Sequence, residues 1–420
     1  MKRLFTVAVV LGCVIAAGCG DKAPSGSTKG GDSVKDETGS GTARFINAAK
    51  KAKGQAEVKK DKAGKEYLLV QFHRGTDDDL GELRKALADA PMPVDINANF
   101  NGELSDAGLA HLKGWKNLIG LGVGSPKFTD AGFANLADLD CLESLYIYHT
   151  DELSNACLQS IAKLTSLRVL WCESKKMTRA AYAAVSGLSK LEKVRLGANN
   201  EVGDAELADL ARFHQLRELQ IGGLKISDAG LGRLNDFPEL RELNINVWPD
   251  ADKNVTSKGL ANLSGLAKLE KLTLRSGAAK EDLSALKNLT ALREFTFLTM
   301  NGPKPGVIAS VAQLPNLKTL SFGGYCILDD GLKGLEGAKY LETLDLAGGN
   351  DRFGDDGCKI IAKIPNLKSL NLSSTGVTDA GLAHLKGMTG LRELRIGSTK
   401  TTPAGIAELK KALPNTKIET

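Results

Sequence analysis

Residue types that catalyse reactions or bind metals are present in this sequence, but their spacing matches no catalytic or metal-binding motif. The five histidines form no HExxH motif and no zinc-ligand group with paired cysteines. The acidic segment 249–254 has the D-x-D-x-N spacing of a calcium loop but lacks the central glycine and the distal glutamate. No GxSxG motif and no glycine-rich phosphate loop follows a predicted strand. We therefore predict that the protein is not an enzyme and needs no cofactor or metal.

Side chains suited to binding are concentrated in one stretch of the chain. Tyr146, Tyr148 and Trp171 are three of the only nine residues that are Tyr or Trp, counting six Tyr and three Trp. Arg195 follows them, and exposed aromatic side chains beside an arginine are the usual anchors of protein interfaces. The stretch is a candidate ligand site if these side chains share one surface. The alternative is that the aromatic rings merely cover the structure or meet an inserted loop.

The composition sets broad limits on the function. Hydrophobic residues make up 42% of the 420-residue chain and charged residues 25%, as in ordinary globular proteins. The net charge is only +5, without the clustered basic face that a dedicated nucleic-acid-binding protein needs. We therefore expect no nucleic-acid partner.

An LxxLxL pattern recurs along most of the chain. Its copies begin at Leu118, Leu142, Leu167, Leu191, Leu216, Leu240, Leu269, Leu292, Leu317, Leu341, Leu367 and Leu391. Successive copies are 23 to 26 residues apart, except for one step of 29 residues after Leu240 that marks an insertion. A fixed period of this length predicts a solenoid of stacked units.

Each unit predicts a strand followed by a short helix. In the copy that starts at Leu367, the LxL alternation places Leu370 and Leu372 on one face of a strand. Thr378 is suited to cap a helix, and Asp379 in the first turn favours the helix dipole. Gly387 fits the left-handed residue that ends many helices, and Gly114, Gly187, Gly265 and Gly337 recur at the same place.

These motifs resemble the leucine-rich repeat, and the "TDAGLxxL" tail is similar to that of bacterial cysteine-containing-type repeats in planctomycete envelope proteins. The resemblance implies an α/β fold, a right-handed leucine-rich-repeat solenoid shaped like a horseshoe, with a parallel concave sheet and short convex helices. It also implies a non-enzymatic scaffold that binds a protein or peptide. Stacking is required in any case, because one unit cannot bury its own leucines.

The residues between the core leucines point out of the concave face of such a sheet. This placement predicts a ligand-binding surface on neighbouring strands. Its members are Tyr146, Tyr148, His149, Trp171, Glu173, Arg195, Gln220 and Asn244, with Trp248 on the long insertion as a further contact. The odd number of remaining cysteines and the absence of CxxC spacing argue against a dense disulfide framework, and several of these cysteines occupy apolar repeat positions.

The solenoid needs a cap at each end. Residues 44–93 are predicted to form the N-terminal cap with a degenerate first repeat, from a strand at 67–72, a helix at 80–90 and a further strand at 56–59 over the edge. Residues 94–420 are predicted to form about 13 repeats, closed by a helix at 406–413 and a strand at 415–419. The short polar final strand would protect an exposed sheet edge.

The first residues look like a targeting signal. Lys2 and Arg3 precede an apolar stretch, 4–17, that is too short to span a bilayer as a helix but fits a secretory signal. Small residues before Cys19 resemble the bacterial lipobox, which implies cleavage after residue 18 and a lipid on Cys19. The alternatives are a plain signal peptide or a short membrane anchor. Residues 19–43 are rich in Gly and Ser and predict a disordered linker.

Together these features predict a lipid-anchored bacterial envelope protein that binds through its concave sheet. The membrane is its second partner, through the anchor, and Gly20 after the cysteine favours the outer membrane or periplasmic side. Two alternatives remain at this point. One is a structural envelope protein that associates with its own copies, and the other is a glycan-binding module.

Overall fold

A computed structural model describes most of the chain after residue 39. The described residues are 40–61, 63–99, 101–148, 150–172, 174–178, 180–196, 203–222, 226–246, 255–275, 283–298, 307–323, 327–348 and 351–420. The predicted signal peptide, Cys19 and residues 20–39 of the predicted linker lie outside them.

The described strands form one sixteen-stranded sheet in which strand order follows chain order. The strands are β1 (Gln55–Lys60), β2 (Glu66–Gln71), β3 (Val94–Ala98), β4 (Leu118–Gly124), β5 (Ser144–Tyr148), β6 (Val169–Cys172), β7 (Lys193–Leu196), β8 (Glu218–Gly222), β9 (Glu242–Asn246), β10 (Lys271–Arg275), β11 (Glu294–Leu298), β12 (Thr319–Gly323), β13 (Thr343–Asp345), β14 (Ser369–Asn371), β15 (Glu393–Arg395) and β16 (Lys417–Glu419). All neighbours pair in parallel except β1, which runs antiparallel to β2.

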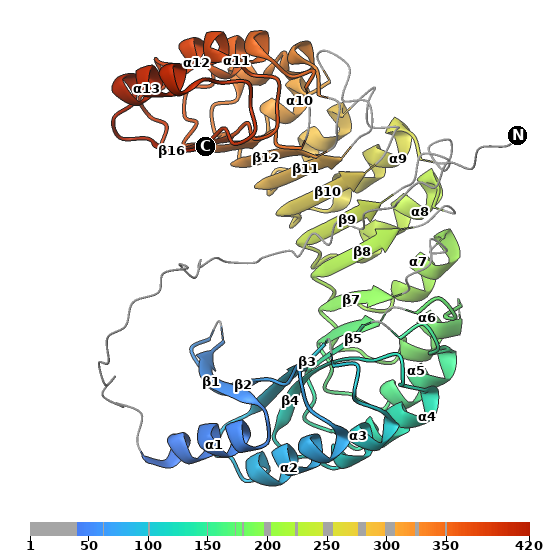
Figure 1. Ribbon diagram of the computed structural model, residues 1–420. Helices are drawn as coiled ribbons and strands as arrows, with labels where there is room; N and C mark the ends of the chain where they lie inside the picture. The colour runs from blue at the N-terminus through green and yellow to red at the C-terminus, as the bar shows by residue number, and fades with distance from the viewer. Residues whose placement is uncertain are drawn as a thin grey trace, which may run out of the picture.

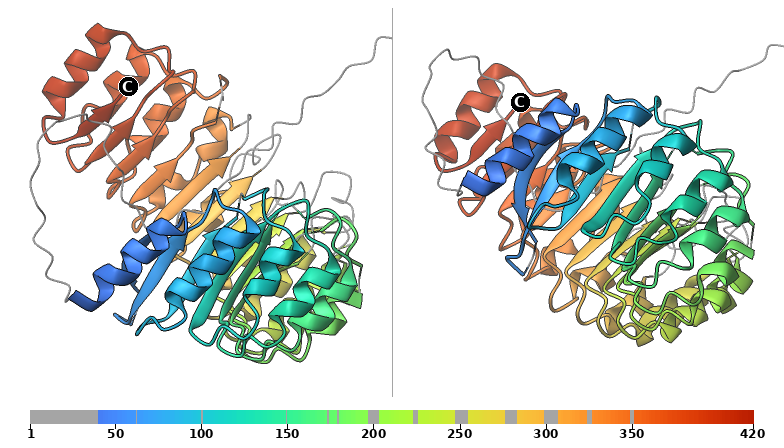
Figure 2. Two further views of the ribbon diagram at one scale, coloured as in Figure 1. Left: turned by 60° about the horizontal axis from the view of Figure 1, so that its bottom comes forward. Right: turned by 90° about the horizontal axis from the view of Figure 1, so that it is seen from below.

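Helices cover the outer side of the sheet. They are α1 (Ser40–Lys51), α2 (Asp77–Leu87), α3 (Asp106–His111), α4 (Asp130–Phe133), α5 (Asn155–Ile161), α6 (Ala180–Val185), α7 (Asp204–Leu210), α8 (Asp228–Gly232), α9 (Ser257–Ala261), α10 (Ala309–Ala312), α11 (Asp355–Ile361), α12 (Asp379–Leu385) and α13 (Pro403–Ala412). Short 3-10 helices follow or replace them at 134–136, 233–236, 262–265, 284–288, 329–332 and 335–337. The sheet lines the inner side of the curve, and α1 and α13 lie at opposite ends (Figures 1 and 2).

The leucines of the repeat make one continuous core between sheet and helices. On β5, Leu145 and Ile147 are fully buried while Tyr146 between them is half-buried on the other face. The same alternation holds on β9, where Leu243 and Ile245 are buried. This is the α/β leucine-rich-repeat solenoid that the sequence predicted, with a parallel sheet and short helices.

The TDAG motif links each repeat to the next. Thr378 caps α12 by accepting from the Ala380 N–H. The Thr378 N–H and hydroxyl both donate to Asp355, at 2.9 and 2.7 Å. Asp355 is the aspartate of the preceding repeat, equivalent to Asp379. Gly381 leaves the space that this carboxylate fills, since a Cβ there would lie 2.5 Å from Asp355 Oδ1. The aspartate therefore does more than favour the helix dipole, which was the role predicted for it.

The same link recurs along the outer side of the solenoid. Its aspartate–cap pairs include Asp77–Ser105, Asp106–Thr129, Asp130–Ser154, Asp204–Ser227, Asp228–Thr256 and Asp379–Thr402. In the repeat that follows Asp130, Cys157 takes the place of the TDAG glycine. The Cys157 N–H donates to the Asp130 carboxylate at 3.2 Å. A chain of charge-assisted hydrogen bonds thus fixes the stacking of successive helices.

One prediction about the glycines that follow the helices was largely wrong. Of the five, only Gly114 has a positive φ, at 65°. After Gly265 and Gly337 the chain turns instead at Leu266 and Ala338, which have φ of −80° and −73°. These helices end in 3-10 turns, so a left-handed residue is not required.

The N-terminal cap contains one helix more than the sequence predicted. The strands predicted at 67–72 and 56–59 are β2 and β1, and the helix predicted at 80–90 is α2, shifted by three residues. The additional helix α1 begins at Ser40, inside the segment predicted as linker. It buries Phe45 and Ala49 against the core.

The start of α2 allows a test of its capping box. The Thr76 hydroxyl accepts from the Asp79 N–H, and Asp79 accepts from the Thr76 N–H at 2.8 Å. The hydrogen bond from Lys53, reinforced by those from Thr76, lowers the pKa of Asp79 to about 2. Because this pKa is depressed, the stabilisation is complete above the ordinary Asp range and is lost as pH falls toward 2.

We therefore expect Asp79→Ala to cost about 1 kcal/mol at pH 7, with the difference from wild type disappearing between pH 4 and pH 2. Urea unfolding across this pH range measures it. Asp78→Ala is the matched control, because Asp78 is an exposed carboxylate in the same helical turn. An equal, pH-independent loss in both variants would contradict the capping role.

Candidate functional site

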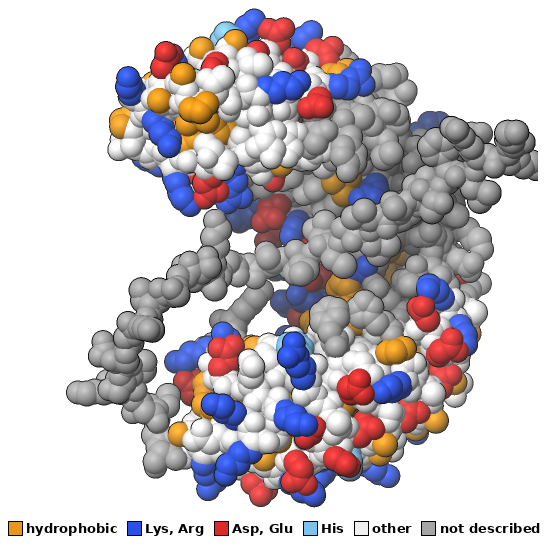
Figure 3. Space-filling model, in the orientation of Figure 1, with side chains coloured by type: hydrophobic (Ala, Val, Ile, Leu, Met, Phe, Trp, Pro, Cys, Tyr) orange, Lys and Arg blue, Asp and Glu red, His pale blue; other side chains and the backbone are white. Residues whose placement is uncertain are grey.

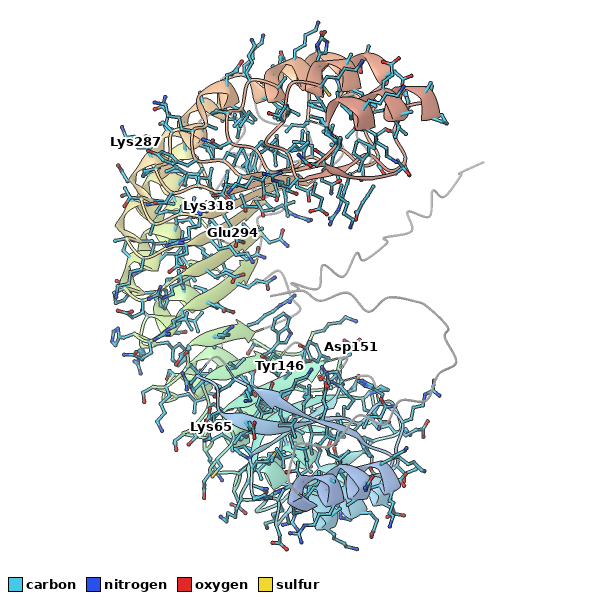
Figure 4. All side chains as sticks on the ribbon, turned by 90° about the vertical axis from the view of Figure 1, so that its left-hand side faces the viewer. Lys65, Tyr146, Asp151, Lys287, Glu294 and Lys318 are labelled. Atoms are coloured by element: carbon cyan, nitrogen blue, oxygen red, sulfur yellow. The ribbon has the colours of Figure 1, made fainter. Side chains whose placement is uncertain are left out.

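The strand register brings the predicted aromatic residues together on the concave face. Tyr146 on β5 is paired with Trp171 on β6, and Trp171 with Arg195 on β7. Tyr148 lies two residues further along β5 and therefore on the same face. Tyr146 is on the inner side of the curve in the N-terminal half of the sheet, whereas Glu294 and Lys318 belong to the C-terminal half (Figure 4).

The three rings form one cluster, here called the aromatic cluster (Tyr146, Tyr148 and Trp171). The two tyrosine rings are nearly parallel, at 8°, with centroids 6.2 Å apart. Trp171 is tilted against both, at centroid distances of 6.3 and 5.7 Å. The Arg195 guanidinium carbon lies 4.0 Å from the Trp171 ring centroid, which is a cation–π contact. The cluster is therefore held in a fixed arrangement by contacts between its own members.

Two polar groups of this cluster are sheltered from water. Burial raises the pKa of the Tyr146 phenol, and the charges of Asp95 and Glu218 raise it further, so Tyr146 stays neutral at physiological pH. The Trp171 indole N–H is buried and has no acceptor within the described part of the chain. A buried donor without a partner costs free energy, which a ligand that supplies an acceptor can recover.

The other predicted site residues have different outcomes. Gln220 on β8 and Asn244 on β9 are paired, half-buried, and continue the same row of concave positions. His149, Glu173 and Trp248 lie outside the described residues, as does Cys19.

The sequence reasoning missed a neighbouring feature on β3 and β4. Asp95, Asn97 and Asn99 follow one another on the concave side of β3 and the turn after it. Next to them β4 carries three glycines, Gly120, Gly122 and Gly124, beyond which come Ser144, Tyr146 and Tyr148 on β5. A signal was present, since Val94 begins an alternating strand 24 residues before Leu118.

The glycines make a trough, here called the glycine trough (the concave side of β4 between β3 and β5). Gly120, Gly122 and Gly124 all have negative φ, so the backbone itself does not demand glycine. Space demands it instead. A Cβ at Gly120 would overlap the Asp95 carboxylate, and one at Gly122 would overlap the Asn99 amide. The backbones of β3 and β5 are two strand spacings, or about 10 Å, apart, and the Asp95 and Asn99 side chains fill part of the space above β4.

Charges elsewhere on the sheet compensate one another. Lys271 lies 3.4 Å from Glu242 and 3.7 Å from Glu294 on the adjacent strands. Glu342 accepts from Lys368 and Lys318, which lowers its pKa. On the face seen in Figure 3, acidic and basic side chains are also intermixed. At these places the described charges of the two signs offset each other.

Among the described residues there is no metal-binding cluster of side chains, and three of the cysteines belong to the core. No group of three or more His, Cys, Asp or Glu side chains there is placed to hold a metal ion. Cys157, Cys172 and Cys358 are buried in the core, as their apolar repeat positions predicted. Burial raises the pKa of Cys358 to about 12, which keeps its thiol protonated and unreactive.

No protein-family model matches the chain, and no curated protein matches it. Several solved structures resemble it. An internalin, InlF, from Listeria monocytogenes gives a TM-score of 0.46 at 17% identity, covering 84% of this chain and 86% of that one. The yeast Rad7 and Elc1 complex gives 0.49 at 19%, covering 82% and 83%. A leucine-rich-repeat protein of Leptospira interrogans gives 0.41 at 14%, covering 82% and 92%. At these identities the likeness concerns the fold alone.

Among the residues that the structure describes, no helix has the length and apolar character needed to cross a bilayer.

Proposed function

We propose that the protein is a non-enzymatic scaffold that binds another protein or a peptide through the concave sheet of its N-terminal half. The observation that carries this proposal is the aromatic cluster with Arg195 stacked on Trp171. Large rings held rigid by one another lose little conformational entropy when a ligand covers them. Their half-buried faces supply apolar area, and the Trp171 indole N–H, which has no acceptor among the described residues, supplies a directed hydrogen bond.

The rest of the concave face favours this location over the C-terminal half. On β10 to β12 the central concave positions hold Thr273, Thr296 and Ser321, which are small and polar. Such residues can border an interface but are rarely its anchors. A ligand that contacts several strands would therefore be held by the aromatic cluster and only oriented by its neighbours.

The envelope location belongs to the same proposal. The signal-like first residues support lipidation at Cys19 and a tether of 20 residues, from residue 20 to residue 39 before the start of α1. A lipid anchor would hold the concave face close to a membrane, at the outer membrane or on the periplasmic side, where the ligand would be an envelope protein. Replacing Cys19 with Ser should release the chain from the membrane fraction.

The test of binding is photo-crosslinking in cells from a probe at Gln220 on β8, the strand that follows Arg195 on β7. Wild type should capture a partner protein. The amount captured should fall about 100-fold when Tyr146, Tyr148 and Trp171 are all replaced with Ala. The matched control replaces Thr273, Thr296 and Ser321 with Ala and should keep full capture. Equal capture by both folded triple variants would refute the proposal, and crosslinks only between copies of this chain would favour the structural self-associating alternative.

A further inference from the structure

The glycine trough presents acceptors that nothing in the described structure satisfies. The Asp95 carboxylate lies over Gly120, on the floor of the trough. In the part of the chain that the structure describes, no basic side chain and no hydrogen-bond donor offsets its burial, which raises its pKa. The Asn99 side-chain oxygen, over Gly122, is also buried and has no partner among the described residues. Both groups therefore carry a desolvation cost that a ligand could relieve.

Aromatic rings lie on both sides of this carboxylate. Tyr67, half-buried on β2, and Tyr146 on β5 both lie within the electric field of Asp95, whose charge contributes to raising the pKa of each phenol. On β4, which lies between Asp95 on β3 and Tyr146 on β5, the concave positions are all glycine. No side chain of β4 therefore covers Asp95 on the concave side. A buried carboxylate next to aromatic faces is the combination that attracts an organic cation.

The contrast with the other acidic residues of the sheet makes Asp95 exceptional. Glu342 has two lysines within 3.1 Å, and Glu393 pairs with Arg395 at 2.7 Å. A metal ion is a poor occupant for the trough, because a single carboxylate and one amide oxygen are fewer ligands than Ca²⁺ or Mg²⁺ requires. An apolar side chain would leave the carboxylate uncompensated.

We propose that the glycine trough receives a Lys or Arg side chain of the bound protein or peptide, with its charge at Asp95 and Asn99 and its aliphatic stem along Tyr146. This inference rests on the proposed function and specifies the chemistry of its ligand. Asp95 would be a specificity-determining residue, and the aromatic cluster would hold the remainder of the ligand. The glycines are required because a Cβ at Gly120 or Gly122 would displace Asp95 or Asn99, the two groups that would hold the cation.

Selection of displayed random dodecapeptides against the immobilised full chain tests the proposal. Clones selected on wild type should be enriched in Lys or Arg at one position. Their affinity should fall about 10- to 100-fold for Asp95→Asn, since a charge-assisted hydrogen bond and its ion pair are lost. Asp345→Asn on β13 is the control, because Asp345 also faces the concave side but lies in the C-terminal half. A synthetic peptide with the sequence of a selected clone, but norleucine in place of the enriched Lys, should bind wild type more weakly by the same factor. Its affinity for Asp95→Asn should be no weaker than its affinity for wild type.

The outcomes separate this inference from the proposed function. One outcome is a set of clones that bind wild type but not the variant with Tyr146, Tyr148 and Trp171 all replaced by Ala. If these clones are not enriched in Lys or Arg, or bind Asp95→Asn as tightly as wild type, the cation site is refuted and the scaffold function stands. Clones that bind the triple variant as well as wild type, or no clones at all, would overturn both.

The stability of Asp95→Asn provides an independent readout. A carboxylate whose pKa is raised by burial destabilises the folded state at pH values above the ordinary Asp pKa, so Asp95→Asn should melt at a higher temperature than wild type at pH 7. This gap should close as pH falls through the raised pKa, with Tyr67 and Tyr146 neutral throughout. A lower melting temperature for the Asn variant would mean that Asp95 has a structural role instead.

Discussion

Gly381→Ala is expected to destabilise the protein by about 2–4 kcal/mol, although alanine is the better helix former. Within a helix, glycine to alanine ordinarily gains about 0.5–1 kcal/mol. At Gly381 the sign should reverse, because the new Cβ would lie 2.5 Å from Asp355 Oδ1 and 2.8 Å from Val377 Cγ1. The carboxylate could then no longer accept both Thr378 hydrogen bonds, and the contact between α11 and α12 would open.

Two comparisons isolate this mechanism in urea unfolding. Gly387→Ala, at the end of the same repeat's helix, meets nothing within 4 Å and should change the stability by less than about 0.5 kcal/mol. Asp355→Ala removes the group that Gly381→Ala displaces, so the cost of the second substitution should shrink in the double variant. Additive costs in that cycle would show that the aspartate and the glycine act independently.

The TDAG motif illustrates what the sequence could and could not predict. The leucine spacing was sufficient for the strands, because period-two alternation depends only on residues next to one another. Asp355 and Gly381 contact each other across 26 positions, so their coupling appears only when one repeat is stacked on the next. One hint was available. After Arg179, which stands in place of the aspartate, the next repeat has Glu206 in place of glycine, and its side chain accepts from the Gly203 N–H.

The candidate site divides in the same way. Tyr146, Trp171 and Arg195 could be placed on one row from the repeat register alone, and their contacts confirm that placement. The glycine trough could not, since three glycines on a strand signify only missing side chains until the neighbours are known. Asp95 had no visible role because its strand lacks the leucines that mark the repeat, having Val94 and Ile96 instead.

Removal of the N-terminal cap is expected to have the largest effect on solubility. A chain that begins at residue 61 lacks α1 and β1 and would expose the edge of β2 along all six of its paired residues. It would also uncover core residues of β2 that pair with β1, among them Leu68 and Val70, which are fully buried in the intact chain. An open parallel edge above an apolar core recruits further strands, so this chain should elute as aggregates in size-exclusion chromatography.

A chain that begins at residue 40 is the matched control, because it keeps α1 and β1 and removes only the segment before them. It should elute as the full chain does and unfold at the same urea concentration. Phe45→Ala is an intermediate variant between these two chains, since it removes the largest side chain that α1 buries but keeps β1 on the sheet edge. It should lower the free energy of unfolding by about 3 kcal/mol. If the chain from residue 61 stayed monodisperse while Phe45→Ala lost this stability, α1 would stabilise the first repeat without being needed to protect the sheet. Loss of solubility by the chain from residue 40 would instead assign a capping role to residues before α1.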